Sequence, residues 1–245
     1  CEDHIPVFEY CKKIGIDFIS TPYDVESADF LVSIGVKIFK TASADIVDLS
    51  LHRYISRHAE LAIISTGMAT LGEIEQVVKI YRDNNCKFTL LHCVSNYPCS
   101  IGSLNLKVIN TLKNAFLCDV GYSDHAVGPG PAIASVALGV SIIEKHFTLD
   151  KNMVGPDHKA SCDPVEFDEL VRAIRDTELA LGDAFKTVQA EEMQMRQVSR
   201  KSLFLARNVE KGEVFTADMF VLKRPGDGLY EAELSVIIGA MCTKK

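Results

Sequence analysis

Two segments of the chain each place a histidine directly after a short apolar run. GYSDH at residues 121–125 follows the run at 116–120, and EKHFTLD at 144–150 follows the run at 140–143. The apolar residues between them, 131–139, are numerous enough for a short helix. Strand, helix and strand in this order predict two neighbouring parallel strands. The polar ends of both strands would then share one edge of the sheet, where parallel α/β barrels gather their catalytic groups.

His125 and His146 therefore form a candidate metal site. Imidazole is a common ligand of divalent metal ions. A single histidine more often satisfies a local hydrogen bond, and this structural reading holds for either residue taken alone. The matched placement of the two histidines after neighbouring strands favours the metal site.

The same alternation of strand and helix extends over most of the chain. The expected strands are residues 16–20, 36–41, 61–65, 88–92, 116–120 and 140–143. The expected helices are the opening segment, a segment capped by Thr70 and Glu73, and residues 27–34, 48–58, 105–114, 131–139 and 164–181. Such units would also suit an open doubly wound sheet. Because every strand ends in polar residues, we predict an α/β fold, a (β/α)8 TIM barrel lacking its first two strands.

The sequence changes character after the barrel domain, which we place at residues 1–183. Residues 184–197 are polar and are expected to be a linker, and residues 198–245 are expected to form a small β-rich domain. Its expected short strands, with turns that contain glycine, lie in the segments 202–206, 209–214 and 219–222. Because the chain starts within a helical pattern without Met and stops just after an apolar segment, we expect a fragment whose second domain is truncated.

Composition narrows the class of protein. The formal net charge of −7 argues against a nucleic-acid partner, since phosphate backbones bind basic surfaces. No apolar run is long enough to span a membrane, and no signal peptide is seen. The eight cysteines are scattered without a CxxC pair, which predicts reduced thiols in a cytoplasmic protein.

Hydroxyl groups and one lysine dominate the predicted strand ends. A lysine among hydroxyls suits a phosphate or carboxylate ligand, although a single serine there more often caps the next helix. Lys40 lies on a strand expected to be buried, so its charge needs an anionic partner. That partner could be Asp45 or Asp24 in a structural salt bridge, or a bound anion, and Lys40 could also be a Schiff-base amine. The full set of residues at the predicted strand ends is Thr21, Lys40, Ser43, Ser65, Ser95, Tyr97, Ser123, His125 and His146.

A further carboxylate lies in a loop after the last of these strands. Asp157, in GPDH at 155–158, could orient substrate hydroxyls or act as a base. It could equally bond its own backbone in a turn.

These motifs, taken together and in order, resemble the sialic acid synthase family, which includes N-acetylneuraminate, legionaminic and pseudaminic acid synthases and a related spore-coat polysaccharide protein. The tail, from VSRKS at 198–202 to KRPGDG at 223–228, resembles the antifreeze-like (SAF) domain of that family. The resemblance covers essentially the whole chain. The barrel motifs are STPYD at 20–24, FKTAS at 39–43, STGM at 65–68, HCVSNYP at 92–98, GYSDH at 121–125, IEKHFTLD at 143–150 and GPDH at 155–158.

The resemblance implies a reaction and its partners. The family condenses phosphoenolpyruvate with an N-acetylated hexose, such as N-acetylmannosamine or a 2,4-diacetamido-6-deoxy hexose, to a nine-carbon 2-keto sugar acid and phosphate. It implies His125 and His146 as ligands of Mn²⁺, although Mg²⁺ or Co²⁺ would suit the same donors. The residues it implies for phosphoenolpyruvate are Thr21, Lys40, Ser43, Ser65, Ser95 and Ser123.

It also implies that Tyr97 and Asp157 contact the sugar. Arg224 matches an arginine that reaches the partner's site in a domain-swapped homodimer. Asp45, where several members have Glu, is implied in placing water or a proton. Ser95 stands where some members have Asn, which could mark a different sugar.

Members of the family carry a glutamate and a lysine on the first two barrel strands. Neither is found in this sequence, so we expect the chain alone to be inactive. Two alternatives remain open: a keto-acid aldolase that forms a Schiff base on Lys40, and a non-catalytic carbohydrate-binding fragment.

Overall fold

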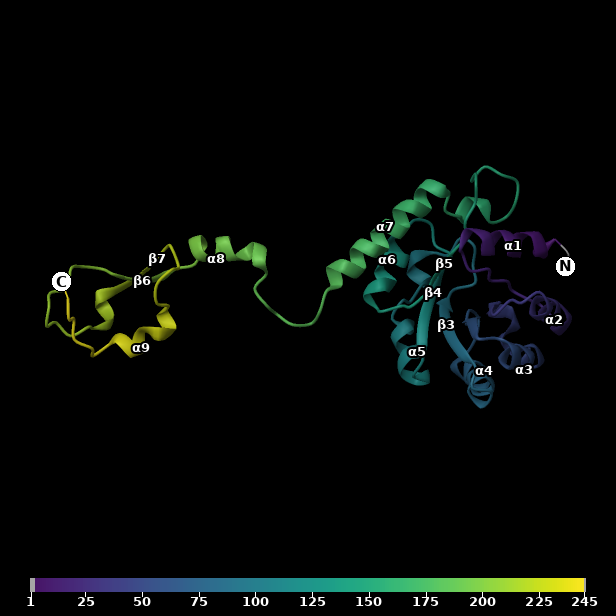
Figure 1. Cartoon of the computed structure of the whole chain (residues 1–245), viewed down its shortest axis with the longest axis horizontal. Coiled ribbons are helices and arrows are strands. Elements are labelled where there is room, and N and C mark those ends of the chain that lie inside the picture. The colour runs from purple at the N-terminus through teal and green to yellow at the C-terminus, as the bar shows by residue number, and fades with distance from the viewer. Residues whose placement is uncertain (1–2, 245) are drawn as a thin grey trace. The chain divides into compact units, whose positions relative to one another are not determined.

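The computed structural model describes residues 3–244. The chain divides into two compact units, Cys1–Gly182 and Asp183–Lys245 (Figure 1). The segment predicted as a linker, 184–197, falls in the second unit and contributes to a helix there, α8 (Met193–Ser199). Gln189 and Glu192 form a capping box just before that helix, a local signal that the polar composition obscured.

The first unit is built on a curled, fully parallel sheet, a half-barrel, in the order β1-β2-β3-β4-β5 (Figure 1). Its strands are β1 (Ile38–Thr41), β2 (Leu61–Ser65), β3 (Lys87–Cys93), β4 (Asp119–Asp124) and β5 (Ile143–Lys145). Its helices are α1 (His4–Ile14), α2 (Val25–Ser33), α3 (Leu49–His58), α4 (Leu71–Asp83), α5 (Val108–Phe116), α6 (Gly130–Ala137) and α7 (Pro164–Leu181). The predicted strand–helix alternation is confirmed.

Helix starts follow the side-chain caps that the sequence provides. Asp24 and Asp48 accept hydrogen bonds from the first turns of α2 and α3. Thr70 and Glu73 form the predicted capping box of α4. These caps fix where each helix begins and therefore how many residues remain for the loop after the preceding strand.

Three predicted strands are wrong in extent. Residues 16–20 form a single bridge, between Ser20 and Phe39, instead of a full strand. The hydrogen bond that Lys40 N donates to Ser20 O joins this edge segment to β1. The strand expected at 116–120 is displaced, since α5 continues to Phe116 and the left-handed Leu117 ends it. The strand expected at 140–143 is displaced in the same direction, to β5. As a result residues 121–124 and 144–145 of the two motifs lie within the strands, and His125 and His146 directly follow the strand ends.

The interior of the half-barrel unit is apolar and continuous. Phe39, Ile64 and Leu90, one from each of three adjacent strands, are fully buried against helices α2 to α5. Gly121 allows β4 to approach its neighbours, because a Cβ there would lie 2.5 Å from Leu91 and 2.6 Å from the Ile142 carbonyl. This close packing sets the strand register on which the polar edge depends.

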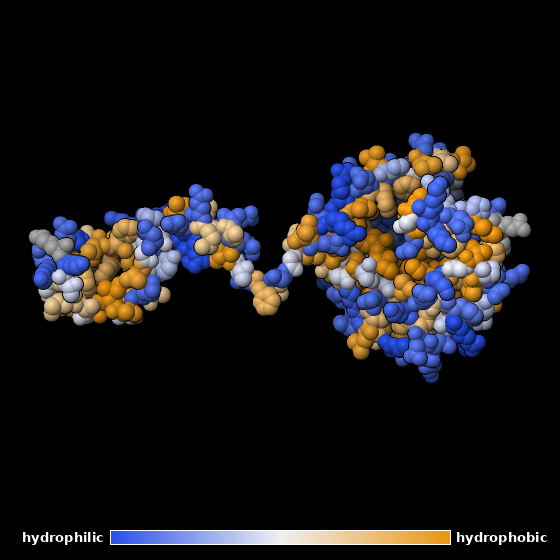
Figure 2. Space-filling view, viewed as in Figure 1, coloured by the Kyte–Doolittle hydropathy of each residue, from blue (hydrophilic) through white to orange (hydrophobic). Residues whose placement is uncertain are grey.

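Helices α6 and α7 cover the β5 end of the sheet. Figure 2 shows apolar residues gathered in a hollow of the first unit, in the region where Figure 1 places α6, α7 and β5. Val136, Leu170 and Ile174 line a cavity of about 210 Å³ there. The strand end that carries His146 is therefore backed by an apolar layer.

The second unit contains an antiparallel pair, β6 (Ser202–Leu205) with β7 (Phe220–Lys223), and a short helix, α9 (Leu234–Ile237). The strand predicted at 209–214 is wrong, since it is reduced to a bridge between Val214 and Met241. Val209, Met219 and Cys242 turn inward to form the small core of this unit instead.

The seven cysteines within the described residues are free thiols, as predicted, while Cys1 lies outside those residues. Among the helices within residues 3–244, none combines the length and the apolar character needed to span a bilayer.

His52 makes the stability of the first unit depend on pH. Burial lowers the pKa of this imidazole to about 4, and its Nδ1 lies 3.1 Å from the Tyr81 hydroxyl. Between pH 6.5 and 4 the unfolded state binds the extra proton, so the free energy of unfolding should fall by about 3 kcal/mol as the pH is lowered through this range. Chemical denaturation at several pH values should show this slope, and His52→Gln should flatten it. The exposed His58, replaced in the same way, is the control, and an unchanged slope in His52→Gln would contradict the assignment.

Candidate active site

The polar strand ends converge on one cavity at the carboxyl edge of the half-barrel. Its volume is about 590 Å³. Each strand of the parallel sheet supplies lining residues, either from the strand itself or from the loop that follows it. The sequence-predicted residues that line it are Thr21, Lys40, Ser43, Ser65, Ser95, Tyr97, Ser123, His125 and His146. The parallel topology thus brings together strand ends that are far apart in the sequence.

Two lysines, Lys145 on β5 and Lys40 on β1, line the cavity, and Lys40 is the one that donates to a serine hydroxyl of the wall. The residue is only 9% exposed, and its Nζ donates to Ser65 Oγ at 2.6 Å and to the Thr41 carbonyl at 3.1 Å. Its ion-pair partner is Glu144, at 3.5 Å, rather than the predicted Asp45 or Asp24. Strand alternation explains this, because Glu144 lies on the face of β5 that is turned towards the cavity.

Glu144 also lines the cavity, although the sequence analysis did not single it out. Its Oε1 accepts a hydrogen bond from Ser123 Oγ at 2.6 Å, and its Oε2 faces Lys40. The carboxylate therefore joins β1 to β4 across the mouth of the half-barrel. The available signal was its position two residues before His146, because alternate residues of an extended segment point to the same side.

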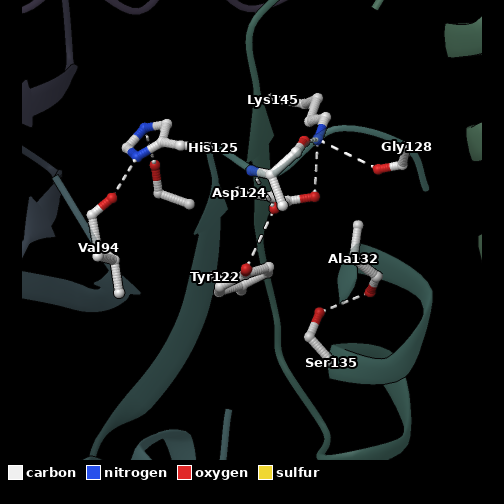
Figure 3. Close-up of polar contacts among 10 residues, drawn as sticks. Val94, Tyr122, Asp124, His125, Gly128, Ala132, Ser135 and Lys145 are labelled. Carbon is white, nitrogen blue, oxygen red and sulfur yellow. Dashed lines mark hydrogen bonds and ion pairs between the residues drawn. The ribbon is translucent and has the colours of Figure 1, made fainter. Parts of the chain in front are cut away.

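His125 presents a free nitrogen lone pair to the cavity. Its Nδ1 lies 2.9 Å from the Val94 carbonyl, which can only accept, so the proton resides on Nδ1 (Figure 3). Its Nε2 lies 3.3 Å from Ser123 Oγ, whose hydrogen is directed to Glu144. Burial lowers the pKa of His125, which keeps the ring neutral.

His146 faces the same space. Its ring lies edge-on to that of His125 with centroids 5.4 Å apart, and Tyr97 packs against both rings at 4.2 Å and 5.3 Å. A neutral imidazole with an uncommitted lone pair beside a second imidazole is a donor set that fits a divalent metal ion. Within residues 3–244 no group of three or more His, Cys, Asp or Glu side chains could hold a metal, so water or substrate oxygens would complete such a site.

Backbone and hydroxyl groups form a tight cradle next to these rings. Gly67 N donates to Ser43 Oγ at 3.0 Å, and that hydroxyl lies 3.2 Å from Cys93 Sγ. A Cβ at Gly67 would lie 2.3 Å from Ser95 Oγ and 2.8 Å from Ser43 Oγ. The hydroxyl groups can converge here only because residue 67 has no side chain.

Asp45 sits beside the cavity, in a short 3-10 helix, Ser43–Val47, that begins at a lining residue. Burial, and then the charge of Asp48, raise the pKa of its carboxyl, against a smaller opposite effect of Lys40. Its Oδ2 is buried without a hydrogen-bond partner among the described residues. A carboxyl in this setting can exchange a proton more readily than an ordinary surface aspartate.

The two remaining predicted residues lie outside the cavity wall. Asp157 precedes a 3-10 turn, and its charge contributes, after burial and the Cys93 and Glu144 charges, to a raised pKa of Tyr97. Arg224 belongs to the second unit, where its Nε donates to the Ser199 carbonyl at 2.7 Å. Their roles remain predictions.

The fold and the cavity define a TIM-barrel-like α/β protein with a polar cavity at the carboxyl ends of its parallel strands. Residues 1–186 match the NeuB family and residues 200–245 match the SAF domain, so the chain belongs to the NeuB family and carries a SAF domain.

Relatives and solved structures agree with this membership. The chain is 43% identical over 244 residues to the N,N'-diacetyllegionaminic acid synthase of Campylobacter jejuni, covering 98% of this chain and 73% of that protein. It is 34% identical over 244 residues to the pseudaminic acid synthase of Helicobacter pylori, covering 99% and 72%. The crystal structure of N-acetylneuraminic acid (sialic acid) synthetase from Leptospira borgpetersenii superimposes with a TM-score of 0.75 and 36% identity, covering 79% of this chain and 68% of that one.

Proposed function

We propose that the protein is a synthase of the sialic acid type, which condenses phosphoenolpyruvate with an N-acetylated hexose. The observation that carries the proposal is the placement of Lys40 and a set of serine hydroxyls beside the two histidines in one cavity. An ammonium with several hydroxyl donors suits the phosphate and carboxylate of phosphoenolpyruvate. The names of the relatives support the same reaction class. In this proposal the half-barrel is a (β/α)8 barrel without its first two strands.

The reaction forms a carbon–carbon bond between C3 of phosphoenolpyruvate and the aldehyde carbon of the sugar. Water then adds at C2, and phosphate leaves with cleavage of its C–O bond. Lys40, Ser65 and Ser123 hold the phosphoenolpyruvate dianion, and Ser43, Ser95 and Thr21 complete the cradle. Tyr97 and Asp157 contact the sugar, and Asp45 places the water or accepts its proton.

His125 and His146 would hold a divalent cation, and we propose that this cation is Mn²⁺. When bound, the ion supplies Lewis-acid polarisation of the sugar aldehyde oxygen. Arg224 would reach the site of a partner subunit in a domain-swapped homodimer. The Schiff-base alternative is less well supported, because Lys40 Nζ already donates to Ser65 and Thr41 and faces Glu144.

The test follows phosphate release by the full-length gene product after metal removal. Phosphoenolpyruvate is offered with N-acetylmannosamine or with a 2,4-diacetamido-6-deoxy hexose, each with and without Mn²⁺. Release that requires both Mn²⁺ and one sugar supports the proposal and identifies the acceptor. Release without any sugar contradicts it, and so does a complete lack of release with either sugar.

Gly67→Ala tests the hydroxyl cradle. Because its Cβ would displace Ser95 and Ser43, we expect kcat/KM for phosphoenolpyruvate to fall about a hundredfold, with a normal circular dichroism spectrum. Gly72→Ala, in α4, is the matched control, since nothing lies within 4 Å of its Cβ. Near wild-type kinetics in Gly67→Ala would show that substrate does not depend on the cradle.

A further inference from the structure

A buried ion pair joins the residues that directly precede the two histidines in the chain. Asp124 precedes His125 on β4, and Lys145 precedes His146 on β5. The two residues are register partners in the sheet, and Lys145 Nζ lies 2.8 Å from Asp124 Oδ2 (Figure 3). Their side chains are 2% and 0% exposed for Lys145 and Asp124 respectively, so the pair is withdrawn from solvent.

The ammonium of Lys145 holds the chain on both sides of His125. Besides the Asp124 carboxylate, it donates to the Ala126 carbonyl at 2.5 Å and to the Gly128 carbonyl at 3.4 Å (Figure 3). One side chain therefore fixes the residue before His125 and the turn after it. Since Lys145 directly precedes His146 in the chain, it links the backbones that carry both imidazoles.

Asp124 completes this arrangement from the other strand. Its Oδ1 accepts hydrogen bonds from Ala126 N at 3.0 Å and from the Tyr122 hydroxyl at 3.1 Å. Both oxygens are thus engaged, and Asp124 is not among the residues that line the cavity. The proposed chemistry uses neither Asp124 nor Lys145, although burying two charges is costly unless their geometry is well satisfied.

We propose that Asp124 and Lys145 are a positioning pair for the metal site. They fix the register of β4 against β5 and the turn after His125, and so hold the two imidazoles at a spacing that binds a divalent cation. This inference rests on the proposed metal site. It differs from a purely stabilising role, because it predicts weaker metal binding in a variant that remains folded.

The test measures Mn²⁺ affinity, with free Mn²⁺ counted by electron paramagnetic resonance during titration of the metal-free, full-length gene product. Lys145→Met alone leaves the Asp124 carboxylate buried without its counter-charge, so the neutral double variant Asp124→Asn/Lys145→Met is measured beside it. The amide oxygen introduced by Asp124→Asn keeps an acceptor for Ala126 and Tyr122, whereas the lysine contacts with the 126 and 128 carbonyls are lost. We expect the Kd for Mn²⁺ to rise about tenfold or more in both variants.

Lys113→Met is the matched control. Lys113, on α5, donates to the carbonyls of Leu138 at 2.8 Å and of Gly139, which precede β5 rather than follow it. Lys113 therefore also donates to backbone carbonyls next to β5, but at the opposite end of the sheet. Its loss should leave the Kd for Mn²⁺ unchanged. Thermal unfolding of all variants is recorded in parallel.

Three results would overturn the proposal. A wild-type Kd in the folded double variant would show that the pair does not position the histidines. Equal weakening in Lys113→Met would attribute the effect to general destabilisation. Absence of Mn²⁺ binding by the folded wild-type protein would instead overturn the metal site itself, and the positioning role with it.

Discussion

Replacing His146 by alanine in the full-length gene product is expected to lower metal-dependent kcat/KM about a thousandfold, while the fold survives. The proposed cation has two protein ligands, so loss of one removes half of the protein's donors. The structural cost should be small, because His146 is partly exposed and its described side-chain contacts are ring contacts with Tyr97 and His125. Phosphate release and Mn²⁺ titration measure the two losses separately.

His58→Ala is the control for this variant. His58 is an exposed histidine at the end of α3 that stacks on Tyr54, away from the cavity lining. Its loss should leave both turnover and Mn²⁺ affinity unchanged. Wild-type rates in His146→Ala would remove the metal from the proposed reaction.

Lys40→Met should have a comparably large effect, with a loss of about a hundredfold to a thousandfold in kcat/KM for phosphoenolpyruvate. Lys40 is the cation that the cavity directs towards the ligand, since Lys145 is committed to Asp124. Methionine keeps the length and apolar stem of the side chain but removes the charge. The loss should therefore appear in binding of phosphoenolpyruvate more than in binding of the sugar.

Lys37→Met is the matched control on the same segment. Lys37 makes a 3.9 Å ion pair with Glu60 at the surface, where such pairs contribute little to stability.

Borohydride reduction in the presence of a keto acid separates the two roles considered for Lys40. A covalent adduct on Lys40, with turnover insensitive to chelators, would replace the proposed condensation with Schiff-base chemistry.

The sequence predicted the composition of the site better than its internal contacts. Nine strand-end residues were expected in one cavity, and all nine line it. Glu144 was not among them, although it contacts both Lys40 and Ser123. The reason is that β4 and β5 begin later than the strands expected there, at Asp119 and Ile143. β4 also continues through Gly121 and Ser123, residues of low strand propensity, because hydrogen bonding to a neighbouring strand overrides propensity.

Local patterns in the sequence were enough to set the alternation of strands and helices, and through it the edge at which polar residues meet. These features follow from the hydrophobic periodicity, the helix caps and the crossover connections that a parallel sheet requires. Tertiary packing was needed to establish that Lys40 faces Glu144, and that Asp124 pairs with Lys145 next to the histidines. Those pairings depend on the register between segments more than twenty residues apart, and a shift by one residue would turn each side chain to the opposite face of the sheet.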